Sequence, residues 1–249
     1  MKRSVPVLLY HHISPDRETT PLSFEAQLRS LLSAGHQCLS MNDVLQIMRG
    51  EKTQSGPAFS LTLDDGYRDN WEHAFPVLQK LSIPATIYIV TERIGTEGFL
   101  SWENIKVMAA SKLVTFGSHT HTHRHFVRRD PYRNLQDELT KSKSLIEKEL
   151  QTPCDHLAWP WGDYETEWLS VVRKLGYSST ATTLAGANAS GTNPYELRRI
   201  NIRRGSTEWL ASRLRWNEYA ATAAAFGFFY GWDRRAKVWW NNESPYSHG

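Results

Sequence analysis

Short apolar runs rich in β-branched residues alternate along this chain with segments of helical periodicity, and the alternation constrains the fold more than any other feature. Such runs predict buried strands, which we expect at Val5–Tyr10, Phe59–Leu63, Ala85–Val90, Leu113–Phe116, His156–Ala158 and Ser178–Thr182. The helical segments lie within Ser23–Ala34, Met41–Arg49, Trp71–Leu81, Trp102–Ala110, Arg133–Leu150, Glu165–Leu175 and Thr207–Trp216. Strands separated by helices of this length predict βαβ units and a mainly parallel sheet.

The fold class that follows is α/β, with a barrel-like domain as the first choice and an open sheet as the second. The 249 residues are enough for one large domain with a substantial core. We expect a catalytic domain over residues 1–216 and an aromatic-rich extension over residues 217–249. In either α/β architecture the functional site lies at the carboxyl ends of the strands.

The net charge and the amino-terminal sequence indicate which binding partners and which cellular compartment to expect. The net charge is only +3, which offers no bulk electrostatic argument for nucleic acid, and we expect no nucleic-acid partner. The run Val5–Tyr10 contains Pro6 and is followed by histidines rather than by small residues, so we expect a buried strand rather than a signal peptide. The expected location is therefore the cytoplasm.

Two adjacent acids, Asp64 and Asp65, end the apolar run that reaches Leu63. Most adjacent acids are simply solvated, but this pair stands where a core strand is expected to end. If a turn before Gly66 directs both carboxylates into one cavity, one can serve as a metal ligand and the other as a general base.

A cluster of histidines follows the strand expected at Leu113–Phe116. His119 and His123 are four residues apart, and His121 and His125 repeat the spacing. A helical turn would place each pair on one face, whereas an extended segment would place all four on one face. Imidazole ligands in this number suit zinc and similar divalent ions.

These motifs together resemble the NodB-type polysaccharide deacetylases, also called carbohydrate esterase family 4. The segment Thr62–Tyr67 resembles the first motif of that family, Ser118–His123 resembles its histidine motif, and Ala158–Tyr164 resembles its Tyr-Pro-Tyr-Gly loop. The resemblance covers roughly residues 5–205 and implies a distorted (β/α) barrel.

The resemblance also implies roles for individual residues. Asp64 would be the catalytic base, and Asp65, His119 and His123 would hold the metal. The substrate and oxyanion side would be formed by Pro160, Trp161 and Tyr67, with the backbone N–H of Trp161 contributing to the oxyanion site. Apart from the resemblance, the position of Ser118 beside His119 suits it to orient the ligand rings through hydrogen bonds. Zinc is the expected metal, with cobalt, nickel and manganese as alternatives.

The chain departs from the family pattern in two places. Trp159 stands near the position where many members carry an arginine that contacts the base, and Arg199 is a candidate substitute. No late Leu-x-His motif supplies the general acid. Instead, Tyr10, His11 and His12 resemble the Tyr-His motif of the circularly permuted branch, which assigns the acid to His11, with His12 as the alternative.

The function implied is removal of an N-acetyl group from a hexosamine in a surface polysaccharide, a glycolipid or their precursor. The alternatives are a deacylase or deformylase of another N-acylated sugar lipid and a catalytically silent glycan-binding module. The segment from Tyr219 to Trp232 is rich in alanine and aromatic residues and precedes several cations. We expect it to dock against the barrel or to self-associate, with peripheral membrane contact as a hypothesis.

Overall fold

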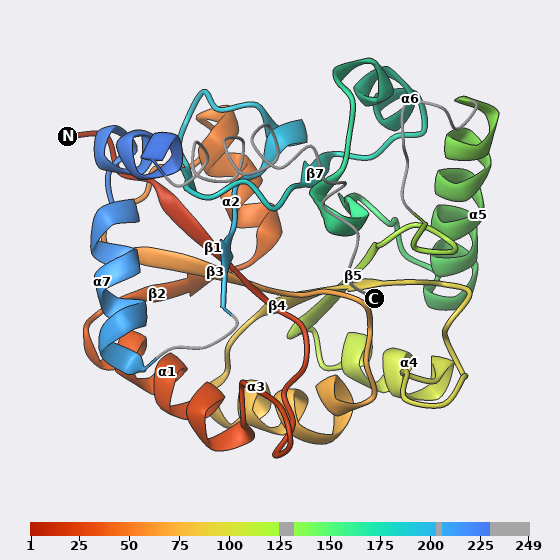
Figure 1. The fold of residues 1–249 in the computed structure, drawn as a ribbon, viewed down its shortest axis with the longest axis horizontal. Coiled ribbons are helices and arrows are strands. Elements are labelled where there is room, and N and C mark those ends of the chain that lie inside the picture. Colours follow the sequence, from red (N-terminus) through yellow and green to blue (C-terminus); the bar gives the residue numbers. More distant parts are fainter. Residues whose placement is uncertain (125–131, 203–205, 230–249) are drawn as a thin grey trace, which may run out of the picture.

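The fold is a strongly curled, mainly parallel sheet with helices packed around its outside (Figure 1). The computed structural model describes residues 1–124, 132–202 and 206–229, with side chains described for all of these except 132–134. The central strands β1 (Val5–Tyr10), β3 (Ala58–Leu63), β4 (Ala85–Ile89) and β5 (Val114–Ser118) cross the middle of the molecule. This architecture confirms the α/β barrel-like class expected from the alternation of elements.

The strand order across the described residues is β7-β6-β5-β4-β3-β1-β8, where β6 is His156–Ala158, β7 is Ser179–Ala181 and β8 is Ala187–Asn188. All these pairings are parallel except that of β1 with β8. Two short strands attach to the sides: β2 (Gln37–Leu39) pairs with β3, and β9 (Ile200–Asn201) pairs with β1. The partner of β1 therefore changes along its length, as expected of a sheet that curls too tightly to stay flat.

Strand β1 is buried on both faces, because the sheet has a core on each side. Leu8 and Tyr10 belong to the larger apolar cluster, and Val5 and Val7 to a smaller one that includes residues of α2 (Met41–Arg49). This alternation follows from the two-residue period of a strand. It also explains why the parallel strands read as continuous apolar runs in the sequence.

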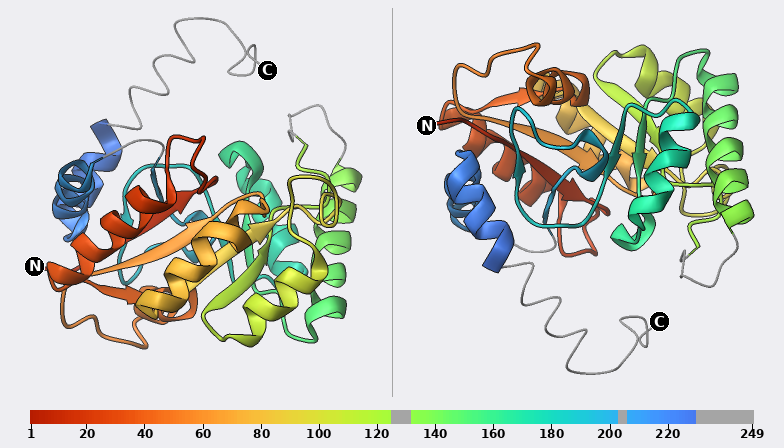
Figure 2. Two further views of the ribbon diagram at one scale, coloured as in Figure 1. Left: turned by 90° about the horizontal axis from the view of Figure 1, so that it is seen from below. Right: turned by 90° about the horizontal axis from the view of Figure 1, so that it is seen from above.

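Helices cover the sheet from several directions, and Figure 2 shows them from below and above. They are α1 (Pro21–Ser33), α3 (Phe75–Leu81), α4 (Trp102–Ala110), α5 (Tyr132–Leu150), α6 (Leu169–Lys174) and α7 (Thr207–Asn217), besides α2. Local signals fix several of their ends. Ser40 and Asp43 form a capping box at the start of α2, and Gly50 ends that helix in the left-handed conformation. None of the described helices is long and apolar enough to cross a membrane.

Two expected helices are interrupted. The segment expected at Trp71–Leu81 begins as a π-helix over Asn70–Ala74 and becomes α3 only at Phe75. Pro76 has no N–H to offer the preceding turn, which accounts for the break. The segment expected at Glu165–Leu175 begins as a 3₁₀ turn over Thr166–Trp168 before α6. The sequence pattern did not predict β2 or β8, because two or three residues carry too little periodicity. The alternation of residues over Arg198–Arg204 does predict a strand, and β9 forms within that stretch.

The start of the expected extension is packed on the barrel. After α7 the chain continues as a second helical segment over residues 220–229. Ser4 of the first strand region donates from its backbone N–H to the Glu218 carbonyl (2.9 Å) and from its hydroxyl to the Asn217 carbonyl (2.7 Å). Residues 217–220 thus pack beside residues 2–4, and Ala223 and Phe226 of the following helix are also buried. The remainder of the expected extension, 230–249, lies outside the described residues.

Candidate metal and catalytic centre

The polar motifs meet at the carboxyl ends of neighbouring parallel strands. Asp64 and Asp65 directly follow β3, and His119 directly follows β5, with β4 between them. Asp65 has a φ of 75°, a left-handed conformation that few residues other than glycine adopt. This turn keeps both neighbouring carboxylates buried near His119, where a continuing strand would have pointed them in opposite directions.

Asp65, His119 and His123 form one group of potential metal ligands, whose ligand atoms all lie within 4.8 Å of one another. Asp65 Oδ1 is 3.2 Å from His123 Nε2 and 3.5 Å from His119 Nε2. This oxygen is buried and, within the described part of the chain, has no hydrogen-bond partner. A buried, unsatisfied carboxylate oxygen facing two imidazoles fits a divalent cation, since two histidines and one carboxylate are a familiar three-ligand set with open positions.

His119 is held in the tautomer that a metal ligand needs. Its Nδ1 donates to the backbone carbonyl of Ala158 at 2.8 Å, and a carbonyl can only accept. The proton is therefore on Nδ1, and the Nε2 lone pair faces Asp65. Hydrogen bonds of this kind commonly orient histidine ligands.

The loop that carries the second histidine is neither helical nor extended, so both geometries considered for the histidine motif are wrong. Thr120 and His123 have positive φ values of 65° and 60°, and the His123 N–H donates to Thr120 Oγ1 at 3.1 Å. This turn, rather than a shared helix face, places His123 next to Asp65. His121 instead contacts Thr91 Oγ1 through Nδ1 at 2.9 Å, and His125 lies outside the described residues.

Glu138 of α5 anchors this histidine loop. Its carboxylate accepts hydrogen bonds from the backbone N–H groups of His121 (3.1 Å) and Thr122 (2.8 Å) and from the Thr122 hydroxyl (2.9 Å). Ser118 adds a second tie, because its Oγ accepts from the Thr120 N–H at 3.1 Å and donates to Ser142 Oγ at 2.8 Å. The sequence motifs did not predict a role for Glu138. Its position next to Leu135 and Leu139, on the apolar stripe of α5, was the feature that could have indicated a buried acid.

Asp64 is paired with Arg199 rather than with the ligand group. Arg199 Nη1 donates to Asp64 Oδ1 at 2.7 Å and Nη2 donates to Oδ2 at 2.8 Å, and both side chains are almost fully buried. The guanidinium also donates from Nε to the Thr182 carbonyl at 2.8 Å. A bidentate pair of this kind fixes the carboxylate in plane and in position.

Trp159, near whose position the arginine of many family members was expected, is a core residue here. Its side chain is fully buried and packs against Tyr164 and Trp168 with ring centroids 6.0 Å away in each case. Arg199 directly precedes β9, and its side chain contacts Asp64. An arginine therefore contacts the carboxylate, but it comes from a later position in the sequence than that of Trp159. Arg198, its neighbour, is exposed, so the two adjacent arginines have different surroundings.

The loop after β6 carries Trp161 to the edge of the site. Trp161 adopts a left-handed φ of 62°, its ring meets that of His123 edge-on at 5.3 Å, and about half of its side chain is exposed. Gly162 follows with a φ of 81°, and a Cβ there would lie 2.2 Å from Thr183 Oγ1. Only glycine therefore allows the Pro160–Gly162 turn to close against Thr183.

The two amino-terminal histidines have different surroundings. His12 Nδ1 lies 2.6 Å from Asp69 Oδ2, and its ring stacks on Tyr67 with centroids 3.5 Å apart. Behind the stronger influence of Arg199 on Asp64 and of His123 and His119 on Asp65, the His11 charge also contributes to lowering the pKa of both carboxyls. Asn70, at the start of the π-helix, donates to the His11 carbonyl at 3.0 Å and to Asp69 at 2.8 Å. No sequence motif predicted these contacts of Asp69 and Asn70 with the two histidines.

Burial and neighbouring charge set the protonation of the centre. Burial alone would raise the pKa of Asp64, but the Arg199 and His119 charges outweigh it and hold the pKa below its ordinary value. For Asp65, burial is likewise outweighed by the adjacent imidazoles of His123 and His119, which hold the pKa of this carboxyl below its ordinary value. Burial lowers the pKa of His119 to about 4 despite both aspartates. The carboxylates are therefore ionised and His119 is neutral near pH 7, which are the states that metal binding requires.

Comparison with known proteins places this centre in a family. Residues 51–180, more than half of the chain, match the family model described as polysaccharide deacetylase. A Bacillus subtilis (strain 168) protein, YxkH, whose name assigns it provisionally to the polysaccharide deacetylases, is 31% identical over 81% of this chain and 72% of its own length. The poly-beta-1,6-N-acetyl-D-glucosamine N-deacetylase of Staphylococcus aureus (strain MRSA252) is 26% identical over 76% of this chain and 69% of its own.

Solved structures agree with the sequence matches. The deacetylase PplD of Streptococcus pyogenes, solved in complex with acetate, superposes with a TM-score of 0.79 at 25% identity and covers 86% of this chain and 99% of its own. IcaB of Ammonifex degensii superposes with the same TM-score and identity, covering 86% of this chain and 97% of its own. The likeness extends over most of the barrel as well as the motif segments.

Proposed function

Because the chain belongs to the polysaccharide deacetylase family, we propose that it is a metal-dependent hydrolase that removes N-acetyl groups from hexosamine residues of a surface polysaccharide, a glycolipid or a precursor. The observation that carries the proposal is the division of labour between two adjacent acids. Asp65 faces the imidazoles of His119 and His123, whereas Asp64 is held apart by Arg199. A hydrolase needs both parts, and a glycan-binding module needs neither.

Asp65, His119 and His123 are the residues proposed to hold the ion. The ligand types favour zinc, and cobalt, nickel or manganese would also be accepted by this set. When bound, such an ion supplies Lewis acidity, which polarises an acyl carbonyl and makes a water molecule easier to deprotonate. The protein contributes burial of Asp65 and His119 and orientation of the ligands by Ala158 and Glu138.

Asp64 is the proposed general base. Its pKa below the ordinary value keeps it ionised at neutral pH, so that it can accept a proton from the attacking water. The bidentate contact with Arg199 fixes the carboxylate, and it reduces the freedom that would otherwise be lost in reaching the transition state. Arg199 is thus proposed as a positioning residue.

His11 is the proposed general acid, which protonates the departing amine of the sugar. Its charge reaches both Asp64 and Asp65, whereas His12 is tied to Asp69 and stacked on Tyr67. His12 and Ser118 are then supporting residues, and Tyr67 remains on the proposed substrate side. The backbone N–H of Trp161 is proposed to stabilise negative charge on the acyl oxygen, and the Pro160–Trp161 turn to line the sugar site.

The substrate class follows from the site and from the relatives. Trp161 exposes an aromatic ring beside the proposed metal ligands, and such a ring can cover the apolar face of a pyranose. The related Staphylococcus aureus protein is named for poly-beta-1,6-N-acetyl-D-glucosamine. We propose an N-acetylglucosamine polymer or oligomer as the first substrate to test.

The test is acetate release from N-acetylglucosamine oligomers, measured together with the mass of the sugar product. Metal-loaded protein should release acetate and leave a free amine, and a chelator should stop the reaction until metal is restored. Binding of oligomers without release would favour a silent glycan-binding module. Loss of formate or of a longer acyl group from sugar lipids, without action on acetylated oligomers, would instead favour the alternative deacylase.

A further inference from the structure

The guanidinium of Arg199 is held along its edges by hydrogen bonds. Its Nε donates to the Thr182 carbonyl at 2.8 Å, and its Nη1 donates to Thr62 Oγ1 at 3.3 Å besides its contact with Asp64. The N–H groups of a guanidinium lie in its plane, so these bonds leave its two flat faces without support. A group that contacts one face would fix the tilt of the plane, and with it the direction in which Arg199 meets Asp64.

The ring of Tyr88, in β4, makes this contact. The Arg199 Cζ atom lies over the Tyr88 ring at 5.6 Å from its centroid, a distance at which the face of an aromatic ring attracts a cation. The two side chains are exposed by only 0% and 1%, so water screens the attraction little. We propose that Tyr88 is a positioning residue, whose ring fixes the tilt of the Arg199 guanidinium and through it the position of the Asp64 carboxylate.

The hydroxyl of Tyr88 contributes nothing to this contact. Its oxygen is buried and has no hydrogen-bond partner among the residues that the structure describes. Burial also raises the pKa of Tyr88 above its ordinary value, so the side chain carries no charge near pH 7. A buried hydroxyl without a partner reduces the free energy of unfolding. The aromatic ring is therefore the part of the side chain that is useful at this position.

Gly117 in the neighbouring strand β5 leaves room for the ring. Tyr88 and Gly117 are paired in the register of β4 with β5. A Cβ at Gly117 would lie 2.7 Å from Tyr88 Cδ1 and 2.8 Å from the His156 carbonyl oxygen, and both distances are too short for carbon atoms of ordinary size. Glycine thus lets the ring approach the β5 backbone. With this backbone as one neighbour and the guanidinium as another, the ring has little freedom to move.

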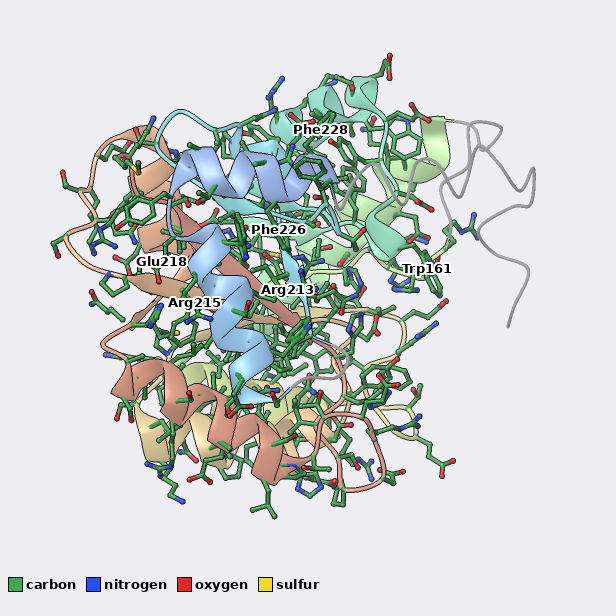
Figure 3. The ribbon with its side chains drawn as sticks, turned by 60° about the vertical axis from the view of Figure 1, so that its left-hand side comes forward. Trp161, Arg213, Arg215, Glu218, Phe226 and Phe228 are labelled. Carbon is green, nitrogen blue, oxygen red and sulfur yellow. The ribbon has the colours of Figure 1, made fainter. Side chains whose placement is uncertain are left out.

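Tyr88 acts through Arg199 and not on the substrate. It has no exposed area, whereas Trp161, the aromatic residue of the proposed sugar site, is exposed by 55% and lies toward the edge of the molecule in Figure 3. A side chain without exposed area does not touch a glycan. The inference rests on the proposed function, in which Asp64 is the general base. Loss of the ring should therefore lower kcat and leave substrate binding unchanged.

The experiment measures acetate release from N-acetylglucosamine oligomers by zinc-loaded Tyr88→Leu. Its kcat should fall by roughly tenfold, less than expected for Arg199→Gln, because the base keeps its partner but loses part of its alignment. KM and metal content should stay at the wild-type values. Tyr88→Phe should restore kcat, because it keeps the ring and loses only a hydroxyl without a partner. If Tyr88→Leu does not fold, Tyr88→Met replaces it, since a flexible methionine fills irregular gaps.

Phe59→Leu is the matched control. Phe59 is a fully buried aromatic residue of β3 that belongs to the larger apolar cluster, so its loss should reduce stability without lowering kcat. A double-mutant cycle then separates a positioning role from a general loss of packing. In the Arg199→Gln background, Tyr88→Leu should lower kcat by less than about twofold, because the guanidinium through which the ring acts is absent.

Three results would overturn the proposal: equal kcat in Tyr88→Leu and the wild type, a loss in Tyr88→Phe as large as that in Tyr88→Leu, or an undiminished loss in the Arg199→Gln background. If the wild type releases no acetate, the proposed function fails, and urea unfolding of the wild type, the two single variants and the double variant decides the inference instead. Stability losses that overlap in the double variant would support the contact between Tyr88 and Arg199, whereas fully additive losses would refute it.

Discussion

The centre has two walls that are built in different ways. The carboxylate wall is Asp64 with Arg199, and the histidine wall is the loop that carries His119 and His123 toward Asp65. The carboxylate wall depends on distant parts of the sequence, because Asp64 is held by an arginine that follows it by 135 positions. The histidine wall depends on a short loop between β5 and α5, where Thr120 and Glu138 fold the backbone so that His123 returns toward Asp65. The first wall is rigid through a buried ion pair, and the second through hydrogen bonds to backbone N–H groups.

This difference implies that each wall can be damaged without the other. Loss of an interaction in the carboxylate wall should remove catalysis while metal remains bound. Loss of an interaction in the histidine wall should weaken metal binding while the base remains in place. The following variants test this separation.

The largest effect is expected for Asp64→Asn. An amide of the same shape cannot accept the proton from water, so kcat should fall by roughly 10²–10⁴-fold, while metal content measured by elemental analysis should stay at the wild-type level. His119→Ala is the counterpart in the other wall and should lower metal content itself. Full activity in Asp64→Asn would refute the assignment of the base.

Arg199→Gln should have the next largest effect. The base loses its bidentate partner and moves from its position, so kcat should fall by roughly a hundredfold with metal content unchanged. The buried, unpaired carboxylate should also reduce the free energy of unfolding by about 3–5 kcal/mol. The neighbouring Arg198→Gln is the control, since that side chain is exposed, and an equal loss of kcat there would contradict a positioning role for Arg199.

Glu138→Gln tests the hydrogen bonds that hold the backbone of the histidine wall. Replacement of the charged acceptor weakens its hold on the loop, and metal affinity should fall by roughly tenfold. Titration of the metal-free protein with zinc measures this change, and activity at saturating zinc should recover. Asp137→Asn, an exposed acid one residue earlier on α5, should leave affinity unchanged. Weak activity that excess zinc does not restore would mean that Glu138 acts on more than the metal ligands.

The smallest effect on activity is expected from His156 in β6, which belongs to neither wall. Burial lowers its pKa to about 4, and its Nδ1 and Nε2 are 3.0 Å from Ser179 Oγ and 3.1 Å from Asn42 Oδ1. The unfolded chain binds this proton near pH 6.5, whereas the folded chain resists it until about pH 4. The stability contribution is therefore complete above pH 6.5 and is lost as the pH falls toward 4.

Urea unfolding of His156→Gln and the wild type between pH 7 and pH 4 measures this contribution. The wild type should lose stability more steeply, by up to about 1.4 kcal/mol per pH unit. Equal slopes in the two proteins would show that another group governs the pH dependence. Activity at neutral pH should differ little, which would separate a buried structural histidine from the histidines of the centre.

The sequence by itself determined the parts of the protein that local pattern encodes. The bounds of β1, β6, α2 and α4 match the expected ranges, because apolar runs and capping residues act within a few positions. The same local information marked Asp64, Asp65, His119 and His123, since strand ends in a parallel sheet converge. It did not reveal β2 and β8, whose two or three residues are strands only because β3 and β1 offer them partners.

Tertiary structure decided how the marked residues divide their work. The left-handed turns at Asp65, Thr120 and His123 depend on packing and on hydrogen bonds from other elements, so periodicity predicted the wrong backbone for the histidine loop. The pairing of Arg199 with Asp64 exists because β9 lies beside β1, and Trp159 is free to join the core for the same reason. A short motif lists the chemical groups, but only the curled sheet sets the distances and burial that make one aspartate face the imidazoles and its neighbour face an arginine.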